Sequence, residues 1–364
     1  MMSTFTMVGD TERTATLAIF VSGIRREMET NGYRFVSEEQ PDVRLVINFV
    51  DPKNPRHYRR QGKGTFVVTV TENDEPTDSI LHTAYPILIR SLGNMMIYLD
   101  RSQNTRPSTY FITLEQGCYS ASYRQGETDY FRHVFERLQP LASSRLVIDN
   151  TFHPDLPESL WEGDEVTESI NRAGKKLDDM NLLPAPFPIE ELLPPKELRH
   201  IKRLYGIGGL SYGNLSARKD DDQFWMSASG VNKANLQEIG RDILLIKGFD
   251  EEGPAIEISV PKQVEPKRAS VDAIEHWMIY TEHPEVGAIV HIHAWMDGIP
   301  STEINYPCGT VQLAEAVAEQ IRRADDPARA VIGLKNHGLT ITGRDLDDIF
   351  ERIEGRILPQ VPMA

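Results

Sequence analysis

The stretch AIVHIHAW, residues 288–295, decides how the second half of this chain folds. Its run of Ala, Ile and Val is typical of a buried strand, and His291 and His293 stand two positions apart. Side chains at positions i and i+2 of a strand share a face, so the two imidazoles are predicted to project together while Ile292 faces the core. Neutral imidazole nitrogens bind divalent cations, and the pair therefore indicates a metal site. A pair of half-exposed histidines at a strand end would give the same pattern.

The segments around this strand alternate between hairpins and helices. A helix with Ser270 as its N-cap is predicted directly before the strand. Two hairpins are predicted upstream, and a helix, a strand pair that turns at Asn336-His337-Gly338 and a last helix are predicted downstream. In chain order these elements cover residues 212–230, 241–259, 269–287, 309–324, 329–343 and 345–357. They predict one α/β domain over residues 196–364.

Strands and helices also interleave over residues 1–155, which predicts a separate small α/β domain of unknown role. Its expected strands include residues 15–21, 43–50 and 64–72, and a helix that follows them is expected to break at Pro86. Residues 156–195 are predicted to form an acidic helix and a connector, because closely spaced prolines continue neither a helix nor a central strand. The predicted fold class is α/β with two domains.

The composition of the chain limits its partners. The 364 residues and the 40% hydrophobic content suit two packed domains of ordinary size. The formal net charge of −15 repels phosphate backbones, so nucleic acid is not expected as a partner. No stretch of the sequence is apolar over the length of a membrane span, so no transmembrane helix is expected. Two distant cysteines, Cys118 and Cys308, and the lack of an evident signal peptide favour a reducing, cytoplasmic location. A small-molecule substrate is the expected partner.

Four motifs of the second half occur in the order that characterises one known family. They are GNLSAR (213–218), SASG (227–230), SVDAIEHWMIYTEHPEVGAIVHIH (270–293) and NHG (336–338). Together they resemble the class II aldolase/adducin family, which includes fuculose-1-phosphate aldolase and ribulose-5-phosphate 4-epimerase. The resemblance covers roughly residues 195–355 and leaves the N-terminal half out. It implies an α/β/α sheet flanked by helices for the C-terminal domain, and a homo-oligomer that is commonly a tetramer.

The resemblance also implies a metal site. In the family a divalent metal is held by three histidines, which match His291, His293 and His337 here. Zinc is the expected ion, and manganese, cobalt and iron are alternatives. Three imidazoles leave a fourth position open, as in catalytic sites, where the metal stabilises an ene-diolate of the substrate. Asp272 matches an acidic residue of the family, which implies a role as the catalytic base or as the fourth ligand.

In the aldolases of the family, small polar residues hold a substrate phosphate. The substrate-binding residues that the resemblance implies for this chain are Ser211, Asn214, Ser229, Gly230 and Ser270. Hydroxyl groups, an amide and a glycine backbone suit an oxyanion. One serine of the family is Val271 in this chain, so a substrate with a carboxylate, or with no anionic group, stays open.

The resemblance predicts a metal-dependent lyase, such as an aldolase, or an epimerase that acts on a small, sugar-like hydroxycarbonyl compound with or without a phosphate. The alternative is a binding or assembly module that keeps the fold without turnover, as in the adducin branch. The segment between His293 and Gly309 favours this alternative, because it is shorter than in the family, which presents an aromatic acid/base residue there; Tyr306 is its only tyrosine. The complete histidine triad favours the enzyme. Oxygen chemistry at Fe(II) on the same triad is a third hypothesis.

Overall fold

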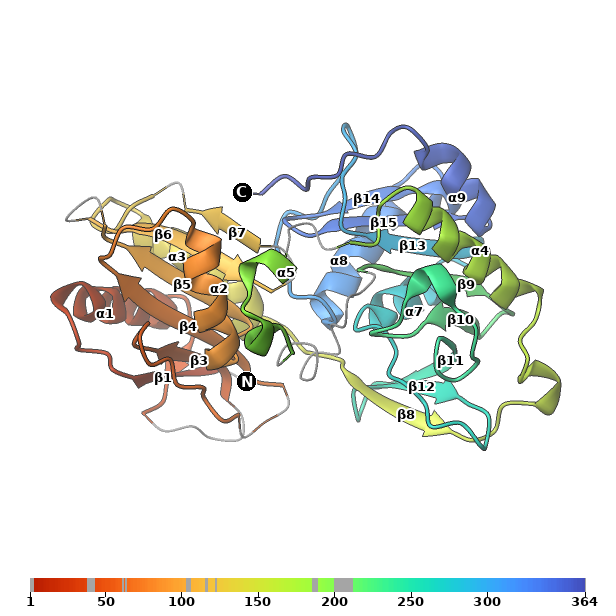
Figure 1. Ribbon diagram of the computed structural model, residues 1–364, viewed down its shortest axis with the longest axis horizontal. Coiled ribbons are helices and arrows are strands. Elements are labelled where there is room, and N and C mark those ends of the chain that lie inside the picture. The colour runs from red at the N-terminus through yellow and green to blue at the C-terminus, as the bar shows by residue number, and fades with distance from the viewer. Residues whose placement is uncertain are drawn as a thin grey trace. The chain divides into compact units, whose positions relative to one another are not determined.

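The structure is a computed structural model that describes residues 3–37, 43–60, 62, 64–102, 106–114, 117–121, 123–184, 189–199 and 212–363. The chain divides into two compact units, and each has its own mixed sheet and helices, which confirms the predicted two-domain α/β class (Figure 1). Unit 1 comprises residues 1–144, 187–200 and 363–364, and unit 2 comprises residues 145–186 and 201–362.

Unit 1 is built around one sheet. Its strands are β1 (Thr4–Gly9), β2 (Arg34–Phe35), β3 (Val43–Phe49), β4 (Phe66–Asn73), β5 (Met95–Asp100), β6 (Ser108–Thr113) and β7 (Gly117–Ser120). The strand order is β2-β1-β3-β4-β5-β6-β7, with β1 to β5 parallel to their neighbours and β6 and β7 antiparallel at one edge. The expected second and third strands are thereby confirmed as β3 and β4.

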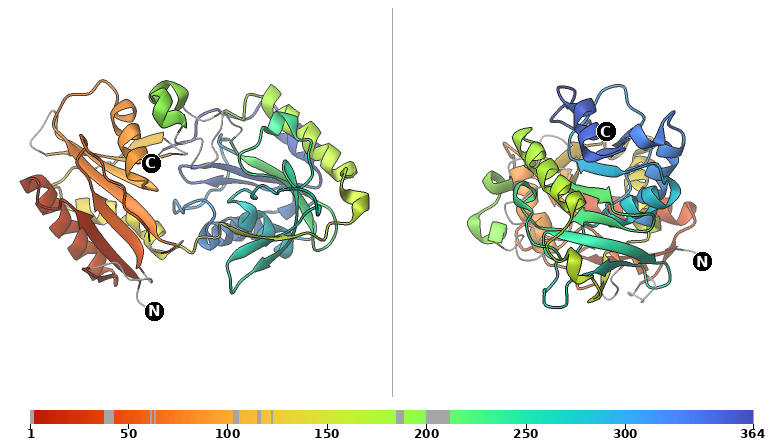
Figure 2. Two further views of the ribbon diagram at one scale, coloured as in Figure 1. Left: turned by 60° about the horizontal axis from the view of Figure 1, so that its bottom comes forward. Right: turned by 90° about the vertical axis from the view of Figure 1, so that its right-hand side faces the viewer.

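The helices of unit 1 cover both faces of this sheet. They are α1 (Ala15–Thr30), α2 (Ile80–Ser91), α3 (Tyr130–Ser143) and the short α5 (Ile189–Leu192). α1 packs beside α3 on one face, and α2 lies on the other (Figure 2). Parallel strands need crossover connections of this kind, which is why helices separate β1 from β2 and β4 from β5.

Two predictions for unit 1 are wrong. Residues 15–21 were expected as a strand, but they form the first turns of α1. Thr14 caps this helix by accepting a hydrogen bond from the backbone N–H of Leu17, and Leu17 and Phe20 are buried at helical spacing. The helix expected to break at Pro86 is α2, which continues through this residue.

Unit 2 is also built around one sheet. Its strands are β8 (Asp149–His153), β9 (Asn214–Arg218), β10 (Phe224–Ser227), β11 (Ile243–Asp250), β12 (Ala255–Ser259), β13 (Ala288–Ile292), β14 (Val331–Leu334) and β15 (Gly338–Gly343). The strand order is β14-β15-β13-β9-β10-β11-β12-β8, and every pair is antiparallel except β12 with β8. The predicted hairpins β9–β10 and β11–β12 and the strand pair β14–β15 are confirmed.

In the described part of unit 2, helices flank this sheet on both faces. They are α4 (Glu165–Asp179), α7 (Ala273–Glu282), α8 (Val311–Arg322) and α9 (Leu346–Ile353). α7 packs beside α8 on one face, whereas α4 and α9 cover the other (Figures 1 and 2). This is the α/β/α arrangement that the family resemblance predicts. Among the helices that the structure describes, none combines the length and the apolar character that crossing a bilayer requires.

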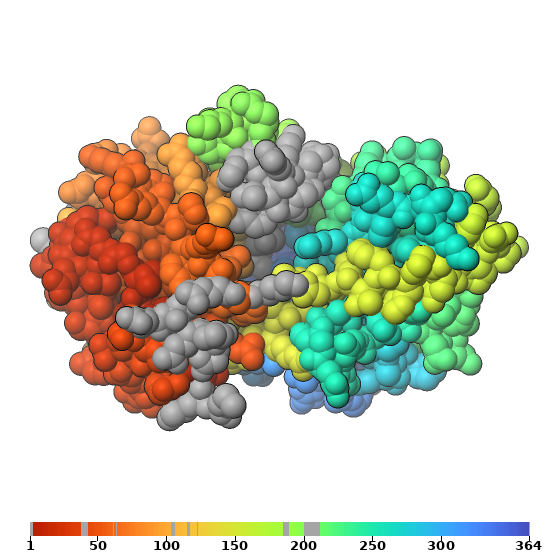
Figure 3. Space-filling model, turned by 90° about the horizontal axis from the view of Figure 1, so that it is seen from below, coloured from red at the N-terminus to blue at the C-terminus, as the bar shows by residue number. Residues whose placement is uncertain are grey.

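The predicted boundaries at residues 155 and 195 differ from the division of the structure. β8 pairs with β12, so the chain enters unit 2 before residue 155, and Figure 3 shows β8 in yellow at the surface beside the teal residues of β12. α4 also contributes to the core of unit 2. Residues 187–200 then return to unit 1, where Arg90 Nη2 donates to Glu197 Oε1 at 2.6 Å.

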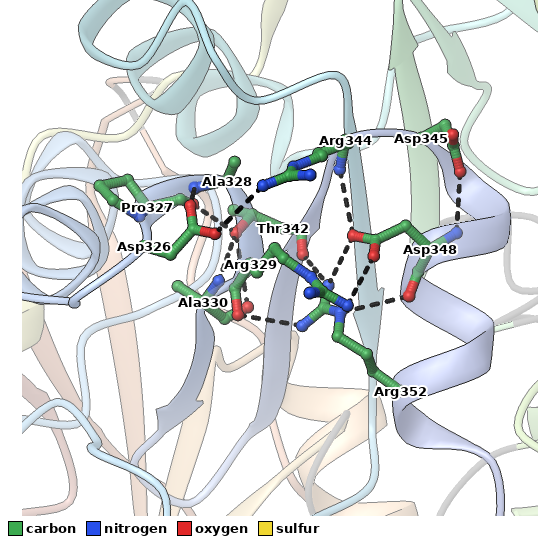
Figure 4. A network of polar contacts seen from close by, with 10 residues as sticks. All are labelled: Asp326, Pro327, Ala328, Arg329, Ala330, Thr342, Arg344, Asp345, Asp348 and Arg352. Carbon is green, nitrogen blue, oxygen red and sulfur yellow. Dashed lines mark hydrogen bonds and ion pairs between the residues drawn. The ribbon is translucent and has the colours of Figure 1, made fainter.

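A charged network fixes α9 to the end of β15, the strand that starts directly after His337 (Figure 4). Arg352 Nη1 donates to the carbonyl oxygen of Arg329 at 2.9 Å, and Arg352 Nη2 donates to the carbonyl oxygen of Thr342. Asp348 and Arg329 form an ion pair of 2.9 Å. β15 leads out of the turn that holds His337. Its pairing with β13 fixes it along its length, and the charged network fixes its far end.

Candidate metal centre

Three histidine side chains of unit 2 converge on one point. His291 lies in β13, His293 follows the end of this strand, and His337 lies in the turn between β14 and β15. The ring centroids are 5.2 Å apart for His291 and His293, 4.8 Å for His291 and His337, and 4.9 Å for His293 and His337. One nitrogen of each ring lies within 4.8 Å of the other two. The structure therefore brings together the three side chains that were predicted as ligands.

Two glycines allow the neighbouring strands to approach the histidine strand. Gly213 precedes β9 with φ +72°, and a Cβ built on it would lie 2.3 Å from the carbonyl oxygen of His291. A Cβ on Gly338, the first residue of β15, would lie 2.2 Å from the carbonyl oxygen of Ile292. A side chain at either position would push β9 or β15 away from β13.

Replacement of Gly213 by alanine is expected to destabilise unit 2 by about 3 kcal/mol, because it adds a steric clash to the cost of a left-handed backbone. The matched control is Gly298→Ala, since Gly298 has φ +73° and nothing within 4 Å of a built Cβ; this variant should lose only about 1 kcal/mol. All four tryptophans lie in unit 2, so urea unfolding followed by tryptophan fluorescence reports on this unit alone. Equal losses of unfolding free energy in Gly213→Ala and Gly298→Ala would contradict the close approach of Gly213 to the backbone of His291.

Burial keeps the three imidazoles neutral. The side chains of His291 and His337 are buried, at 1% and 3% exposure. Burial lowers the pKa of His291 to about 4 and that of His337 to about 3, and it holds the pKa of His293 well below its usual range. A neutral imidazole offers one nitrogen lone pair, which is the form that binds a cation.

A hydrogen bond at the triad directs the lone pair of His291. Nδ1 of His291 lies 3.0 Å from the carbonyl oxygen of Leu339, so Nδ1 donates its proton to this oxygen and Nε2 carries the lone pair. His291 Nε2 and His293 Nδ1 are buried without a hydrogen-bond partner among the described residues. A carbonyl that orients a ligating imidazole is usual at protein metal sites. Buried lone pairs that lack a donor fit a divalent cation, and His291, His293 and His337 would hold it.

Asp272 lies next to the predicted substrate residues. It is the N-cap residue of α7, but its carboxylate caps no backbone N–H; instead Asp272 Oδ2 accepts from Asn214 Nδ2 at 2.8 Å. Oδ1 is buried and has no hydrogen-bond partner in the described part of the chain. Burial raises the pKa of Asp272, against the opposing effects of His337, Asn214 and Ser270. A buried carboxyl group with one oxygen that lacks a partner in the described part of the chain can accept a proton.

The predicted substrate residues fall into three groups. Asn214 and Ser270 are in direct contact, because Asn214 Nδ2 donates to Ser270 Oγ at 3.0 Å as well as to Asp272. Ser229 and Gly230 are exposed and follow Ala228, which forms a β-bridge with Ala269 beside Ser270. The backbone N–H of Ser229 donates to the carbonyl oxygen of Arg268. The hydroxyl of Ser229, rather than its backbone N–H, would therefore donate to a ligand. Ser211 lies outside the described residues.

Behind the triad, α7 carries two buried polar side chains. Nδ1 of His276 lies 2.7 Å from Ser216 Oγ, so this histidine bonds to β9 rather than to Asp272. Glu275 accepts from Thr340 Oγ1 at 2.5 Å, and Thr340 is paired with His291 across the strands. Burial raises the pKa of Glu275 to about 8, so its carboxyl is predominantly protonated at neutral pH.

Sequence reasoning missed Lys233 and Glu275. Lys233 lies in the short helix η2 (Lys233–Asn235) after the SASG motif, is 3% exposed, and interacts electrostatically with Asp272. Glu275 stands with His276 in the mainly apolar stretch AIEHWMIY, which indicates burial. The stretch VNKANL around Lys233 is half polar and does not indicate burial.

Lys233 is expected to make unit 2 more stable as the pH rises above neutral. Burial lowers its pKa from the ordinary 10.5 to about 8, so between these values the unfolded chain binds more protons than the folded one. The metal-free wild type should therefore gain on the order of 3 kcal/mol relative to Lys233→Met between about pH 8 and 10.5. Urea unfolding of both proteins by tryptophan fluorescence measures the difference. If the difference in unfolding free energy between the two proteins does not change with pH, Lys233 has the same protonation state in the folded and the unfolded chain.

The comparisons with known proteins point to one family. Residues 198–296 match the family model of the Class II Aldolase and Adducin N-terminal domain. The chain is similar to the L-fuculose phosphate aldolase of Methanocaldococcus jannaschii, with 28% identity over 173 residues that cover 42% of this chain and 82% of the relative. It is similar to the methylthioribulose-1-phosphate dehydratase of Klebsiella pneumoniae, with 22% identity over 174 residues that cover 39% of this chain and 79% of the relative.

A solved structure gives a weaker match. An L-fuculose 1-phosphate aldolase aligns with a TM-score of 0.36 and 19% identity over 53% of this chain and 81% of that chain. The resemblance that the four sequence motifs predicted is thereby confirmed by the family model and the curated relatives.

Proposed function

The C-terminal half of this chain is a class II aldolase/adducin-like domain, and on this premise we propose that the protein is a divalent-metal-dependent lyase or epimerase. Its substrate is a small, sugar-like hydroxycarbonyl compound, and a phosphorylated one is favoured because the relatives above are named for sugar phosphates. The observation that carries the proposal is the convergence of three neutral imidazoles, of which His291 Nε2 and His293 Nδ1 are buried without a hydrogen-bond partner among the described residues. Zinc is the ion that this ligand set suits best, and iron, cobalt and manganese are the alternatives.

A bound cation would supply the Lewis acidity that stabilises negative charge on the substrate's carbonyl and hydroxyl oxygens. The chain's own residues supply the rest. Asp272 is the base: Asn214 and Ser270 tie down Oδ2, which leaves Oδ1 to take a proton. Burial raises the pKa of this carboxyl toward the working pH, which improves a general base and later a general acid.

Substrate orientation falls to the polar residues around Asp272. The hydroxyls of Ser229 and Ser270, the amide of Asn214 and the backbone of Gly230 are the groups that would hold an oxyanion. Lys233 is a buried basic side chain that interacts electrostatically with Asp272, and its charge favours an anionic substrate over a neutral one.

A panel of sugar phosphates, their dephosphorylated forms and sugar acids tests the activity. The zinc-loaded protein is incubated with each compound in deuterated water, and proton exchange and product formation are followed by NMR. We expect at least one phosphorylated compound to exchange the proton next to its carbonyl group or to be cleaved. Chelation should abolish the reaction, and added metal should restore it.

The second candidate is a binding module of the adducin type. It is favoured by the short segment between His293 and Gly309, which lacks room for the acid/base element that the family resemblance implies. Metal-loaded, folded protein that leaves the whole panel unchanged would contradict the enzyme and support this candidate.

The remaining features of the proposal concern partners. We propose a homo-oligomer of the family's kind, a small-molecule substrate and no nucleic-acid partner, since the net charge of −15 opposes a phosphate backbone. A cytoplasmic location suits a chain whose two cysteines, Cys118 and Cys308, lie far apart in the sequence. Light scattering after gel filtration measures the oligomeric state.

A further inference from the structure

A cavity of unit 2 lies away from the candidate metal centre. β9, β13 and β15 carry Asn214, His291 and the turn of His337 at one end, and the cavity lies at the opposite end of the same strands. α4 and the start of α9 also line it. Its volume is about 360 Å³, which is enough for a small molecule. None of the roles assigned above to the metal centre uses this cavity.

Small residues keep the cavity open. Ala217 near the end of β9 and Gly287 directly before β13 line it with little or no side chain. A Cβ built on Gly287 would lie 1.8 Å from the carbonyl oxygen of Arg344, so a larger residue does not fit there without moving the chain. Val166 of α4 and Leu346 of α9 add apolar side chains. Part of the cavity is therefore suited to an apolar group.

Two guanidinium groups at the cavity are available to a ligand. The basic side chains that line it are Arg172, Arg218, Lys219 and Arg344. Arg218 donates to backbone carbonyl oxygens, and Lys219 pairs with Asp220 at 3.0 Å. Arg172 is exposed, and Arg344 approaches Asp326 only to 3.8 Å in an exposed ion pair of the weak kind (Figure 4). Arg172 and Arg344 can therefore bind an anionic group.

Carboxylates balance these charges. The acidic side chains that line the cavity are Asp220, Asp221, Asp345 and Asp347. Asp345 caps α9, and Asp347 accepts from Lys176 Nζ at 2.8 Å. Asp221 is exposed, and its carboxylate has no hydrogen-bond or ion-pair partner in the part of the chain that the structure describes. Asp221 can therefore bind a cationic group.

We propose that this cavity binds a small zwitterion with an apolar side chain, the chemical class of the aliphatic α-amino acids. Arg172 and Arg344 hold its carboxylate, and Asp221 holds its ammonium group. Val166 and Leu346 contact its side chain. Because the described lining has as many acidic as basic side chains, it favours a ligand without net charge over a simple anion or cation. The proposal does not depend on the function proposed for the metal centre.

Calorimetry with L-valine, L-leucine and L-methionine tests the proposal, and two derivatives of each amino acid remove one charge. The N-acetyl derivative keeps the carboxylate, and the amide keeps the ammonium group. We expect at least one of the three amino acids to bind. Both of its derivatives should bind about tenfold or more weakly, because each lacks one charge-assisted hydrogen bond. Failure of all three amino acids to bind, or equal binding of either derivative, would overturn the proposal.

Variants of unit 2 test where the amino acid binds. Arg172→Met should weaken its binding by about tenfold or more. The matched control is Lys175→Met, since Lys175 is exposed on the same helix and does not line the cavity; this variant should bind as the wild type does. His337→Ala should also bind as the wild type does. Loss of binding in His337→Ala with unchanged binding in Arg172→Met would place the amino acid at the metal centre and overturn the proposal.

A measurement on the wild-type chain covers the case in which a variant fails to fold. Hydrogen exchange of the backbone amides is followed by mass spectrometry, with and without the amino acid that binds. The amino acid should slow exchange in residues 217–221 and 344–347, which line the cavity, and leave residues 336–338 unchanged. Unchanged exchange in both lining segments, or slower exchange in residues 336–338 alone, would overturn the proposal.

Discussion

Replacement of His337 by alanine is expected to abolish cation binding and leave the fold intact. The variant removes one of three ligands but no core side chain, because the turn that holds His337 is fixed by the pairing of β14 with β15. Loss of groups that merely orient a ligand weakens metal binding by about 10–100-fold, so loss of a ligand should exceed about 100-fold. Elemental analysis after dialysis against zinc should find about one ion per wild-type chain and almost none per variant chain.

The matched control for this variant is His283→Ala. His283 is a buried histidine of unit 2 at the end of α7, and its Nδ1 lies 3.4 Å from Glu285 Oε1 rather than at the triad. This control should keep the zinc of the wild type. Tryptophan fluorescence and circular dichroism verify that both variants are folded. A folded His337→Ala protein that binds zinc as tightly as the wild type would remove His337 from the metal centre.

Replacement of Asp272 by asparagine is expected to abolish turnover and leave cation binding unchanged. The amide keeps the shape of the carboxylate and can still accept from Asn214, but it cannot take a proton. General acid–base groups contribute about 10²–10⁴-fold, and this is the loss expected in kcat for the compound that the NMR panel identifies. Zinc affinity, measured on the same preparation, separates the two hypotheses for Asp272, because a fourth ligand would lose affinity as well.

Glu275→Gln is the control for the loss of a buried acid in α7. Its carboxyl is predominantly protonated at neutral pH, since burial raises its pKa to about 8, and glutamine copies that form. Its effect on kcat should stay below about tenfold. If kcat of Asp272→Asn is no lower than kcat of Glu275→Gln, a group other than Asp272 transfers the proton.

The candidate metal centre was largely predictable because its proposed ligands come from short motifs. Alternation in β13 places His291 and His293 on one side, and the Asn336-His337-Gly338 turn marks the end of a strand pair. What brings His337 to them is the pairing of β13 with β15, a long-range contact that periodicity alone does not specify. The family motifs supplied this link, and the ring separations agree with it.

The wrong or missing predictions concern features that the local sequence does not specify. A run of apolar residues such as ATLAIFV is compatible with both a buried strand and a helix. The N-cap at Thr14 and the helical spacing of the buried residues favour the helix α1. β8 was placed in the first unit because its partner β12 lies far along the chain. Lys233 is buried near Asp272 only through tertiary packing, so neither its residue type nor its position in the sequence predicted it.

The most direct test of the central claim is anomalous X-ray diffraction from crystals of the zinc-soaked protein, with data collected on both sides of the zinc absorption edge. The account predicts one strong anomalous peak per chain at about 2.0–2.1 Å from a nitrogen of each of His291, His293 and His337. The absence of a peak between these rings, or a peak bound to other residues, would contradict it.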